Sequence, residues 1–402
     1  MNKIYLDHSA TTRTDEDVAK AMLGYMTETY GNPSSVHSFG RSARKVVEEA
    51  REKVAKAIGA EPNEIIFTSG GTEADNLAIR GVAFANKKRG NHIITSSIEH
   101  HAVLDACKAL EREGFQVTYL PVDENGMVNI DDIRNAITDQ TILISIMHAN
   151  NEVGTIQPIR EIGALAREKG VFFHSDTVQS VGKIPVDVNE LNIDLLSISA
   201  HKFYGPKGIG CLYMRKGVRM LPISFGGSQE RKRRPGTLNV PGIAGFGLAI
   251  EKAVGSLAEQ AAFQARLRDK LIKELTARVK DTKLNGHPTE RLPNNVNLSF
   301  RYIEGESLLL SLDMKGIAAS SGSACTSGSL DPSHVLLALG LSHEIAHGSL
   351  RMTLGKDNTE EEIDYVIEVL PEIVERLRAM SPLYANREKA NHQSKECCSN
   401  VQ

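Results

Sequence analysis

The chain has 402 residues, of which 41% are hydrophobic and 24% are charged, and its formal net charge is −3. This balance is typical of globular proteins and gives no electrostatic argument for nucleic-acid binding; the lack of Trp and the 5% of aromatic residues also disfavour a base-stacking surface. No apolar run approaches membrane-spanning length and the first residues lack the features of a signal peptide, so we expect a cytoplasmic protein that binds neither nucleic acid nor membrane.

The first two thirds of the chain alternate between predicted helices and strands. Apolar periodicity and turn residues predict helices at 15–30, 42–58, 102–113, 131–137 and 158–169, and strands at 64–68, 93–96, 116–120, 141–147, 171–175, 195–199 and 210–214. Strands that alternate with helices form a mainly parallel sheet covered on both faces. The sequence therefore predicts the α/β fold class.

The last third of the chain has a different pattern. Residues 241–279 are predicted to be helical, and they are followed by strands at 295–300 and 348–354 and helices at 307–312, 333–339 and 360–378. We expect a large domain at 15–256 and a smaller α+β domain made of residues 1–14 and 257–383. The small domain carries a Ser- and Gly-rich loop at about 320–330, and the polar tail at 384–402 is expected to be disordered.

Polar residues follow several of the predicted strands. They are Thr72, Glu99 to His101, Asn150 to Glu152, Asp176 with Gln179, and Lys202. Ligands of open α/β sheets bind beyond the carboxyl ends of the strands. These residues are therefore the first candidates for a functional site.

Lys202 lies between a buried apolar run and the glycine-rich turn Gly-Pro-Lys-Gly-Ile-Gly (205–210). Burial lowers the pKa of a lysine, and such a lysine reacts with carbonyls to form a Schiff base. A solvated lysine at the end of a strand is the alternative, and it is the commoner fate of lysines.

Ser-Gly-Gly-Thr (69–72) lies between a predicted strand and a predicted helix. The free N–H groups at a helix N-terminus bind phosphate, and Thr72 adds a hydroxyl donor. An ordinary helix cap explains the same residues. The chain also offers an acid at a strand end, Asp176, a flat ring, His100, and the lysine Lys202. Together with the turn at 69–72, these residues match the groups by which proteins hold pyridoxal phosphate.

The sequence resembles the class V aminotransferase family of fold type I pyridoxal-phosphate enzymes, and more closely the cysteine desulfurases of the NifS/IscS type. The resemblance covers residues 4–383 and rests on long motifs in both predicted domains. These motifs are Tyr-Leu-Asp-His-Ser-Ala-Thr-Thr (5–12), Phe-Thr-Ser-Gly-Gly-Thr-Glu-Ala-Asp-Asn (67–76), Glu-His-His-Ala-Val (99–103), His-Ala-Asn-Asn-Glu-Val-Gly (148–154), Asp-Thr-Val-Gln-Ser-Val-Gly-Lys (176–183), the lysine motif at 197–210 and Ser-Ser-Gly-Ser-Ala-Cys-Thr-Ser-Gly (320–328). It implies a large domain built on a seven-stranded-type, mainly parallel sheet. His8 stands where the resemblance leads us to expect tyrosine or asparagine.

The resemblance also implies a role for each site residue. It assigns catalysis to Cys325, Lys202 and His100, cofactor binding to Lys202, Gly71, Thr72, His100, Asn151, Asp176, Gln179, Ser199, His201 and Thr237, and substrate binding to Arg351, Asn32 and Asn151. Lys202 matches the Schiff-base lysine, Asp176 the partner of the pyridine nitrogen and Gln179 the partner of the ring hydroxyl. His100 is expected to stack on the ring. Thr237 is expected to reach the phosphate of a partner subunit, which makes the enzyme a homodimer.

Cys325 is implied to be the sulfur-carrying residue. It lies in a segment made almost entirely of Ser, Gly, Ala and Thr, which is too polar to bury itself. The resemblance implies that Cys325 takes sulfur from free L-cysteine as a persulfide, leaving alanine, and passes it to an iron–sulfur scaffold protein or another acceptor. No intrinsic metal site is expected, although Cys325 is a candidate ligand of a transient iron–sulfur cluster shared with a scaffold. Cys397 and Cys398 are adjacent in the polar tail and have no assigned role.

Two alternative readings remain at this stage. One is a different reaction on the same cofactor, as in a selenocysteine lyase or an aminotransferase. The other is a non-catalytic scaffold or phosphate-binding module. The position of Cys325 favours desulfuration over the first of these, and the absence of a cofactor absorption band would support the second.

Overall fold

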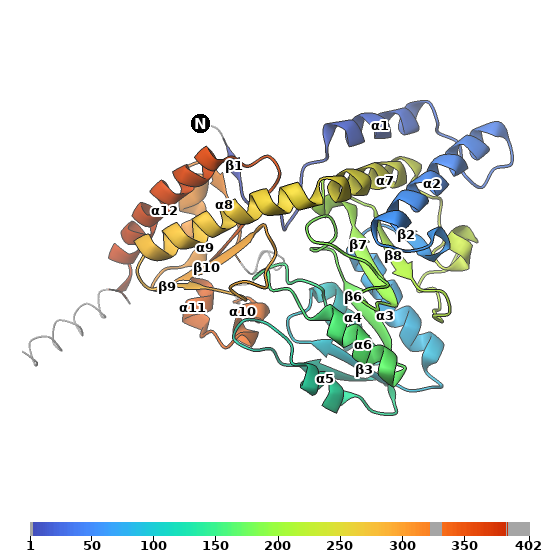
Figure 1. The fold of residues 1–402 in the computed structure, drawn as a ribbon, viewed down its shortest axis with the longest axis horizontal. Coiled ribbons are helices and arrows are strands. Elements are labelled where there is room, and N and C mark those ends of the chain that lie inside the picture. The colour runs from blue at the N-terminus through green and yellow to red at the C-terminus, as the bar shows by residue number, and fades with distance from the viewer. Residues whose placement is uncertain (1–2, 322–331, 383, 385–402) are drawn as a thin grey trace, which may run out of the picture.

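The computed structural model describes residues 3–321, 332–382 and 384. A seven-stranded sheet in the order β2-β8-β7-β6-β5-β3-β4 is the centre of its larger part (Figure 1). The strands are β2 (Ile65–Thr68), β3 (His92–Ser96), β4 (Gln116–Leu120), β5 (Thr141–Ser145), β6 (Phe172–Asp176), β7 (Leu195–Ser199) and β8 (Gly210–Met214). Strand β8 runs antiparallel to both of its neighbours, and the other pairs are parallel. The predicted mainly parallel sheet is thus present, with one reversed strand.

Helices cover both faces of this sheet. They are α1 (Glu16–Thr27), α2 (Ser38–Ala57), α3 (Gly71–Asn86), α4 (His101–Glu111), α5 (Ile130–Ala136), α6 (Ile159–Lys169) and α7 (Val240–Gly255), with short 3-10 turns η1 (Pro62–Glu64), η2 (Ala200–Lys202) and η3 (Gln229–Lys232). One apolar core lies between one face and α2, α6 and α7, and a second lies between the other face and α3 and α4. Neighbouring residues of a strand alternate between the two cores, as Ile65 and Ile66 do.

A smaller part is built from the end of the chain and its first residues. Its antiparallel sheet has the order β12-β10-β9, and β1 pairs in parallel with β11. The elements are β1 (Ile4–Tyr5), β9 (Thr282–Leu284), β10 (Asn295–Phe300), β11 (Ile317–Ala318), β12 (Ser349–Thr353), α8 (Leu257–Arg278), α9 (Gly305–Asp313), α10 (His334–Ala338), α11 (His343–His347) and α12 (Glu360–Ala379). Ile4 and Leu6 belong to the same core as Leu271, Leu298 and Leu370.

The helical run predicted at 241–279 is two helices. The chain bends by 69° between α7 and α8, because Ser256 leaves the helical conformation with φ −108° and ψ 9°. Gly255 and Ser256 are both poorer helix formers than Ala. Figure 1 shows α8 reaching from this bend across to the smaller part, where it lies beside α12.

Within the described ranges, no single helix is long and apolar enough to cross a membrane; only the bent pair of α7 and α8, taken together, meets that criterion by length and composition. All but the first residue of the tail predicted at 384–402, and most of the loop predicted at 320–330, lie outside the described residues.

Candidate active site

The carboxyl ends of β5, β6 and β7 lie together at one edge of the large sheet. Asp176 is the last residue of β6 and Ser199 the last of β7, and η2 carries the chain directly on to Lys202. The N–H of His148, just after β5, donates to the backbone oxygen of Asp176 at 2.8 Å. The parallel register thus gathers predicted site residues that are far apart in sequence.

The N-terminal segment passes over the turn that carries Lys202. The Lys202 Nζ donates to the backbone oxygens of Ser9 and Ala10 at 2.6 and 2.8 Å. The Thr12 hydroxyl donates to the backbone oxygen of His201 at 2.9 Å and accepts the N–H of Tyr204 at 2.8 Å. Lys202 is therefore fixed between the two parts of the molecule and is not a freely solvated lysine.

Asp176 and His100 are both largely removed from solvent. Burial raises the pKa of Asp176, and the charges of His100 and Lys202 act in the opposite direction. The Oδ1 of Asp176 accepts the N–H of Val178 at 2.9 Å. The Nδ1 of His100 accepts the N–H of Ala102 at 3.1 Å and so caps α4. Burial lowers the pKa of His100, and the charge of Asp176 acts in the opposite direction.

Gln179 connects this site to a lysine that sequence reasoning left without a role. Its Nε2 donates to the backbone oxygen of Ser9 at 2.9 Å, and its Oε1 accepts from the Nζ of Lys183 at 2.8 Å. Burial, aided by the charges of Lys202 and Arg351, lowers the pKa of Lys183 to about 7. Lys183 is the last residue of the motif at 176–183, four residues after Gln179. Its place in that motif is the sequence feature that could have identified it as a site residue.

The start of α3 offers bare backbone to the edge of the sheet. A Cβ added to Gly71 would lie 2.8 Å from the Cγ2 of Val178 and 3.6 Å from the Cβ of Ser199, so only glycine allows this approach. Thr72, on the first turn of α3, is exposed. His201 stays neutral, because burial, followed by the neighbouring lysine charges, lowers the pKa of His201 to about 4. The N-terminus of α3 thus has the lack of side-chain bulk and the exposed hydroxyl that suit an anion.

Arg351, on β12, is 2% exposed and only partly satisfied. Its Nη2 donates to Asp7 Oδ1 at 2.9 Å and its Nη1 to the backbone oxygen of Asn151 at 3.2 Å. Its Nε is buried and has no hydrogen-bond partner within the described part of the chain. The backbone of Arg351 also pairs in both directions with Ser320, at 2.7 and 3.1 Å.

Two predicted residues, Asn32 and Thr237, are not brought to this group within one chain, and a third, Cys325, is not among the described residues. Asn32 is exposed between α1 and α2, where its Oδ1 accepts the N–H of Ser34 at 2.9 Å; Figure 1 shows this connection at the end of the molecule away from the smaller sheet. Thr237 is exposed in the segment after η3.

The two described cysteines, Cys107 and Cys211, are fully buried. Burial raises the pKa of Cys107 to about 12 and that of Cys211 further still, so neither supplies a thiolate nucleophile.

These residues fit pyridoxal phosphate. A lysine, a buried carboxylate at a strand end and a helix N-terminus free of side-chain bulk meet at the same edge of the sheet. Each is the type of group that holds one portion of that cofactor.

Comparison with known proteins agrees with this geometry. The family profile described as Aminotransferase class-V matches residues 4–366. The chain is 61% identical to the cysteine desulfurase IscS of Methanosarcina thermophila over 94% of each chain. A solved NifS-like protein is 43% identical with a TM-score of 0.88, covering 93% of this chain and all of that one. A structure of SspA in complex with cysteine is 39% identical with a TM-score of 0.78, covering 87% and 98%.

The likeness to these structures confirms the predicted α/β architecture of a fold type I pyridoxal-phosphate enzyme. The chain belongs to the class V aminotransferase family and, within it, to the cysteine desulfurases.

Proposed function

We propose that this protein is a pyridoxal-phosphate-dependent desulfurase that removes sulfur from L-cysteine, releases L-alanine and holds the sulfur as a persulfide on Cys325. The observation that carries this proposal is the buried Nε of Arg351, which has no hydrogen-bond partner in the described part of the chain. The backbone of Arg351 also pairs with that of Ser320. A donor without a partner suits a substrate carboxylate. Ser320 begins the sequence segment that contains Cys325, so the residue that pairs with the proposed carboxylate ligand opens the segment of the proposed acceptor thiol.

Each side chain around the cofactor has a proposed task. Bound pyridoxal phosphate supplies an electron sink that allows bonds at the substrate Cα and Cβ to break. Lys202 holds it covalently, the Asp176 carboxylate keeps its ring nitrogen protonated, and Gln179 contacts its ring hydroxyl. The remaining cofactor contacts that we propose come from Gly71, Thr72, Ser199 and His201 at the phosphate, His100 on the ring face, and Asn151.

The proton and sulfur movements then fall to this chain's own residues. Lys202, released from its carbonyl partners at Ser9 and Ala10, or else His100, removes the Cα proton. Arg351 holds the carboxylate of cysteine, with Asn151 and Asn32 lining the same pocket. The Cys325 thiolate forms a bond to the substrate sulfur as the bond from that sulfur to Cβ breaks, and protons complete alanine. Sulfur is transferred without an external oxidant, because the electrons of the broken C–S bond stay with the alanine carbon.

The further proposals concern partners and organisation. We propose a homodimer in which Thr237 reaches the phosphate in the partner subunit, which accounts for its exposed place in one chain. We also propose that Asn32 completes its pocket across the same interface. The predicted domains, 15–256 against 1–14 with 257–383, are supported by the separate core that Leu6 shares with α8 and α12.

The destination of the sulfur also remains a proposal. We expect a cytoplasmic enzyme whose persulfide passes to an iron–sulfur scaffold protein or another acceptor, with Cys325 available as a transient cluster ligand.

The test is a mapping of the persulfide. The purified enzyme, loaded with pyridoxal phosphate, receives cysteine labelled with heavy sulfur, and tryptic peptides are analysed by mass spectrometry. We expect label on Cys325, none in Cys325→Ser, and alanine as the co-product. Label confined to Cys397 or Cys398 contradicts the assignment, and undiminished sulfide release by Cys325→Ala indicates another reaction on the same fold. A protein that stays colourless with added cofactor indicates a non-catalytic module.

A further inference from the structure

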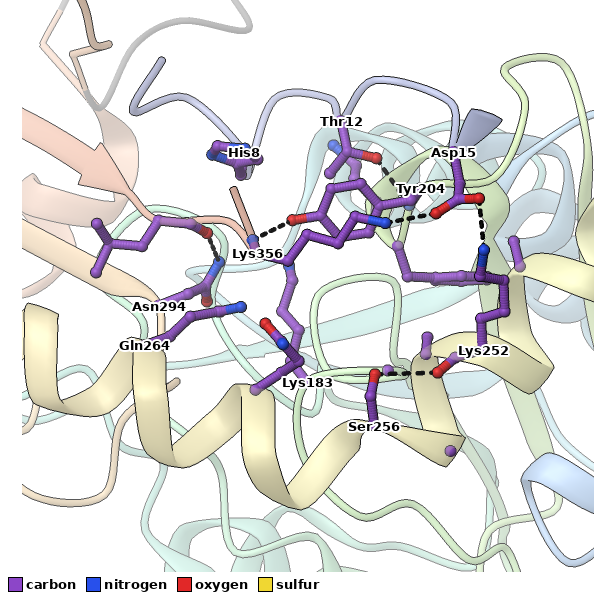
Figure 2. Close-up of a pocket in the computed structure, with 18 residues that line it drawn as sticks. His8, Thr12, Asp15, Lys183, Tyr204, Lys252, Ser256, Gln264, Asn294 and Lys356 are labelled. Atoms are coloured by element: carbon purple, nitrogen blue, oxygen red, sulfur yellow. Dashed lines mark hydrogen bonds and ion pairs between the residues drawn. The ribbon is translucent and has the colours of Figure 1, made fainter. Parts of the chain in front are cut away.

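Lys183 is a partly buried lysine that forms no ion pair within the described ranges. It lines a cavity of about 280 Å³, where Figure 2 shows dashed lines from Asp15 to Lys252 and Lys356 but none from Lys183 to any residue drawn. Burial lowers the pKa of Lys183 to about 7, and no carboxylate of the described residues compensates for this. An apolar side chain would fill such a position at a lower cost, so the lysine indicates a task beyond packing.

The contact that Lys183 does make is with Gln179, and a tight turn directs it there. The Nζ of Lys183 donates to the Oε1 of Gln179 at 2.8 Å, and its backbone N–H donates to the oxygen of Ser180 at 2.9 Å. Gly182 has a φ of 77°, and a Cβ at this position would lie 3.0 Å from the Cβ of Ala253. The turn is therefore closely packed, and its backbone places residues 179 and 183 on the same side.

The Gln179 amide is held at both of its ends. Its Nε2 donates to the backbone oxygen of Ser9 at 2.9 Å, and a carbonyl oxygen can only accept. Its Oε1 faces Lys183, whose ammonium carries only donors. Turning the amide over would set oxygen against oxygen at Ser9 and donor against donor at Lys183. The two neighbours therefore select one orientation of the amide.

This orientation keeps a donor for the cofactor. An amide nitrogen carries two N–H groups, and one of those on Gln179 goes to Ser9. The same oxygen of Ser9 accepts from the Nζ of Lys202 at 2.6 Å, so the amide nitrogen and the lysine that we assign to the cofactor share one acceptor. The second N–H of Gln179 is the donor that suits the ring hydroxyl, whereas a turned amide would present a second acceptor.

We propose that Lys183 is a positioning residue, which holds the Gln179 amide with its nitrogen toward the cofactor and so supplies the ring hydroxyl with an N–H donor. This inference rests on the proposed contact between Gln179 and that hydroxyl. A hydrogen bond donated to the ring oxygen favours its anionic form, and this form gives the cofactor its visible absorption. Without the donor at Lys183, the amide oxygen has no partner and the amide is free to turn.

The test is a double-mutant cycle on the full-length, cofactor-loaded enzyme at pH 6, where Lys183 is an ammonium. Lys183→Met removes the donor and keeps the length of the side chain. We expect the ratio of visible to near-ultraviolet cofactor absorbance to fall about threefold and the dissociation constant of the cofactor to rise about as much, the effect of one ordinary hydrogen bond. Lys183→Arg keeps a donor, has room in the adjoining cavity, and should restore most of both readings.

Gln179→Leu should produce the same changes, and adding Lys183→Met to it should alter neither reading further, because Lys183 acts through the amide. Lys252→Met is the matched control: it removes an ammonium that lines the same cavity but pairs with Asp15, and it should behave as the wild type does.

The inference is overturned if Lys183→Met changes neither reading, or if it keeps its full effect in the Gln179→Leu background. If Gln179→Leu itself changes neither reading, the proposed contact of Gln179 with the cofactor fails too. Both results are distinct from a failure of the proposed desulfurase activity, which the mapping of the persulfide on Cys325 decides.

Discussion

Glu230→Gln is the sharpest test of what holds the basic loop that precedes Thr237. The Glu230 carboxylate is 2% exposed and forms two hydrogen bonds with Arg51, at 2.8 and 2.9 Å, while accepting the N–H of Phe67 at 2.9 Å. The backbone at Glu230, Arg231 and Lys232 has φ of 44°, 56° and 67°. Such left-handed residues each cost about 1–2 kcal/mol, so the buried pair holds a strained segment in place.

The expected magnitude follows from burial on both sides of the pair. The Arg51 side chain is only 4% exposed, and removing Glu230 leaves it one carboxylate partner, Glu48, which is 47% exposed and contacts Arg51 Nε at 3.2 Å. Breaking a buried pair in this way costs about 3–5 kcal/mol. Release of the strained backbone offsets part of this cost, and we therefore expect a loss near the lower end of that range.

Urea denaturation of the cofactor-loaded enzyme, followed by circular dichroism at fixed protein concentration, measures the cost. Glu251→Gln is the matched control, because it removes the same charge from the Lys53–Glu251 pair, whose side chains are 39% and 53% exposed. An exposed pair contributes about 1 kcal/mol or less. Adding Arg51→Met to Glu230→Gln should recover much of the loss, since no charge is then left buried. Equal effects of Glu230→Gln and Glu251→Gln would refute the reasoning.

Three further changes test the site itself. Burial raises the pKa of Glu152 to about 7, so folding favours its protonated form and stability is lost as pH rises from about 4.5 through 7. Glu152→Gln should therefore raise the melting temperature at pH 8 and leave it nearly unchanged at pH 5. A difference in melting temperature that does not depend on pH contradicts this. Gly71→Ala should weaken cofactor binding at least tenfold in an absorbance titration, with Val178→Ala restoring it, because the new Cβ meets Val178; failure of the second change to rescue speaks against the cradle. Arg351→Lys should raise the KM for cysteine about tenfold or more, since the fork of donors is lost, while the visible cofactor band persists; an unchanged KM excludes it as the carboxylate site.

The large sheet was predictable because buried strands are short apolar runs bounded by turns, and each such run at 64–214 is a strand of that sheet. The strand-end rule then located Asp176 and Lys202, whose positions depend only on where β6 and β7 end. The reversed direction of β8 was not predictable from periodicity, because burial on both faces gives a strand the same pattern whichever way it runs. Strands β9 and β11 were not predicted, because strands of three and two residues are too short to show an alternation of apolar and polar residues.

Contacts between distant residues account for what else was missed in the site. Asp7 and Arg351 are 344 residues apart, and nothing in either motif indicates that they form an ion pair. His8 is a similar case. Its Nδ1 contacts the backbone oxygen of Thr353 at 2.9 Å, and the bare backbone of Gly355 leaves the room that its ring fills, since an added Cβ there would collide with His8 Nε2. The unexpected histidine is explained only once residues 8 and 355 are seen to touch.

Asp15 joins three segments through one carboxylate. It caps the start of α1 and pairs with Lys252 in the last turn of α7 and with Lys356, which follows β12. Although burial alone would raise it, the two ammonium groups hold the pKa of Asp15 well below its ordinary value. A single substitution at Asp15 would therefore release the cap of α1 and both lysine contacts together.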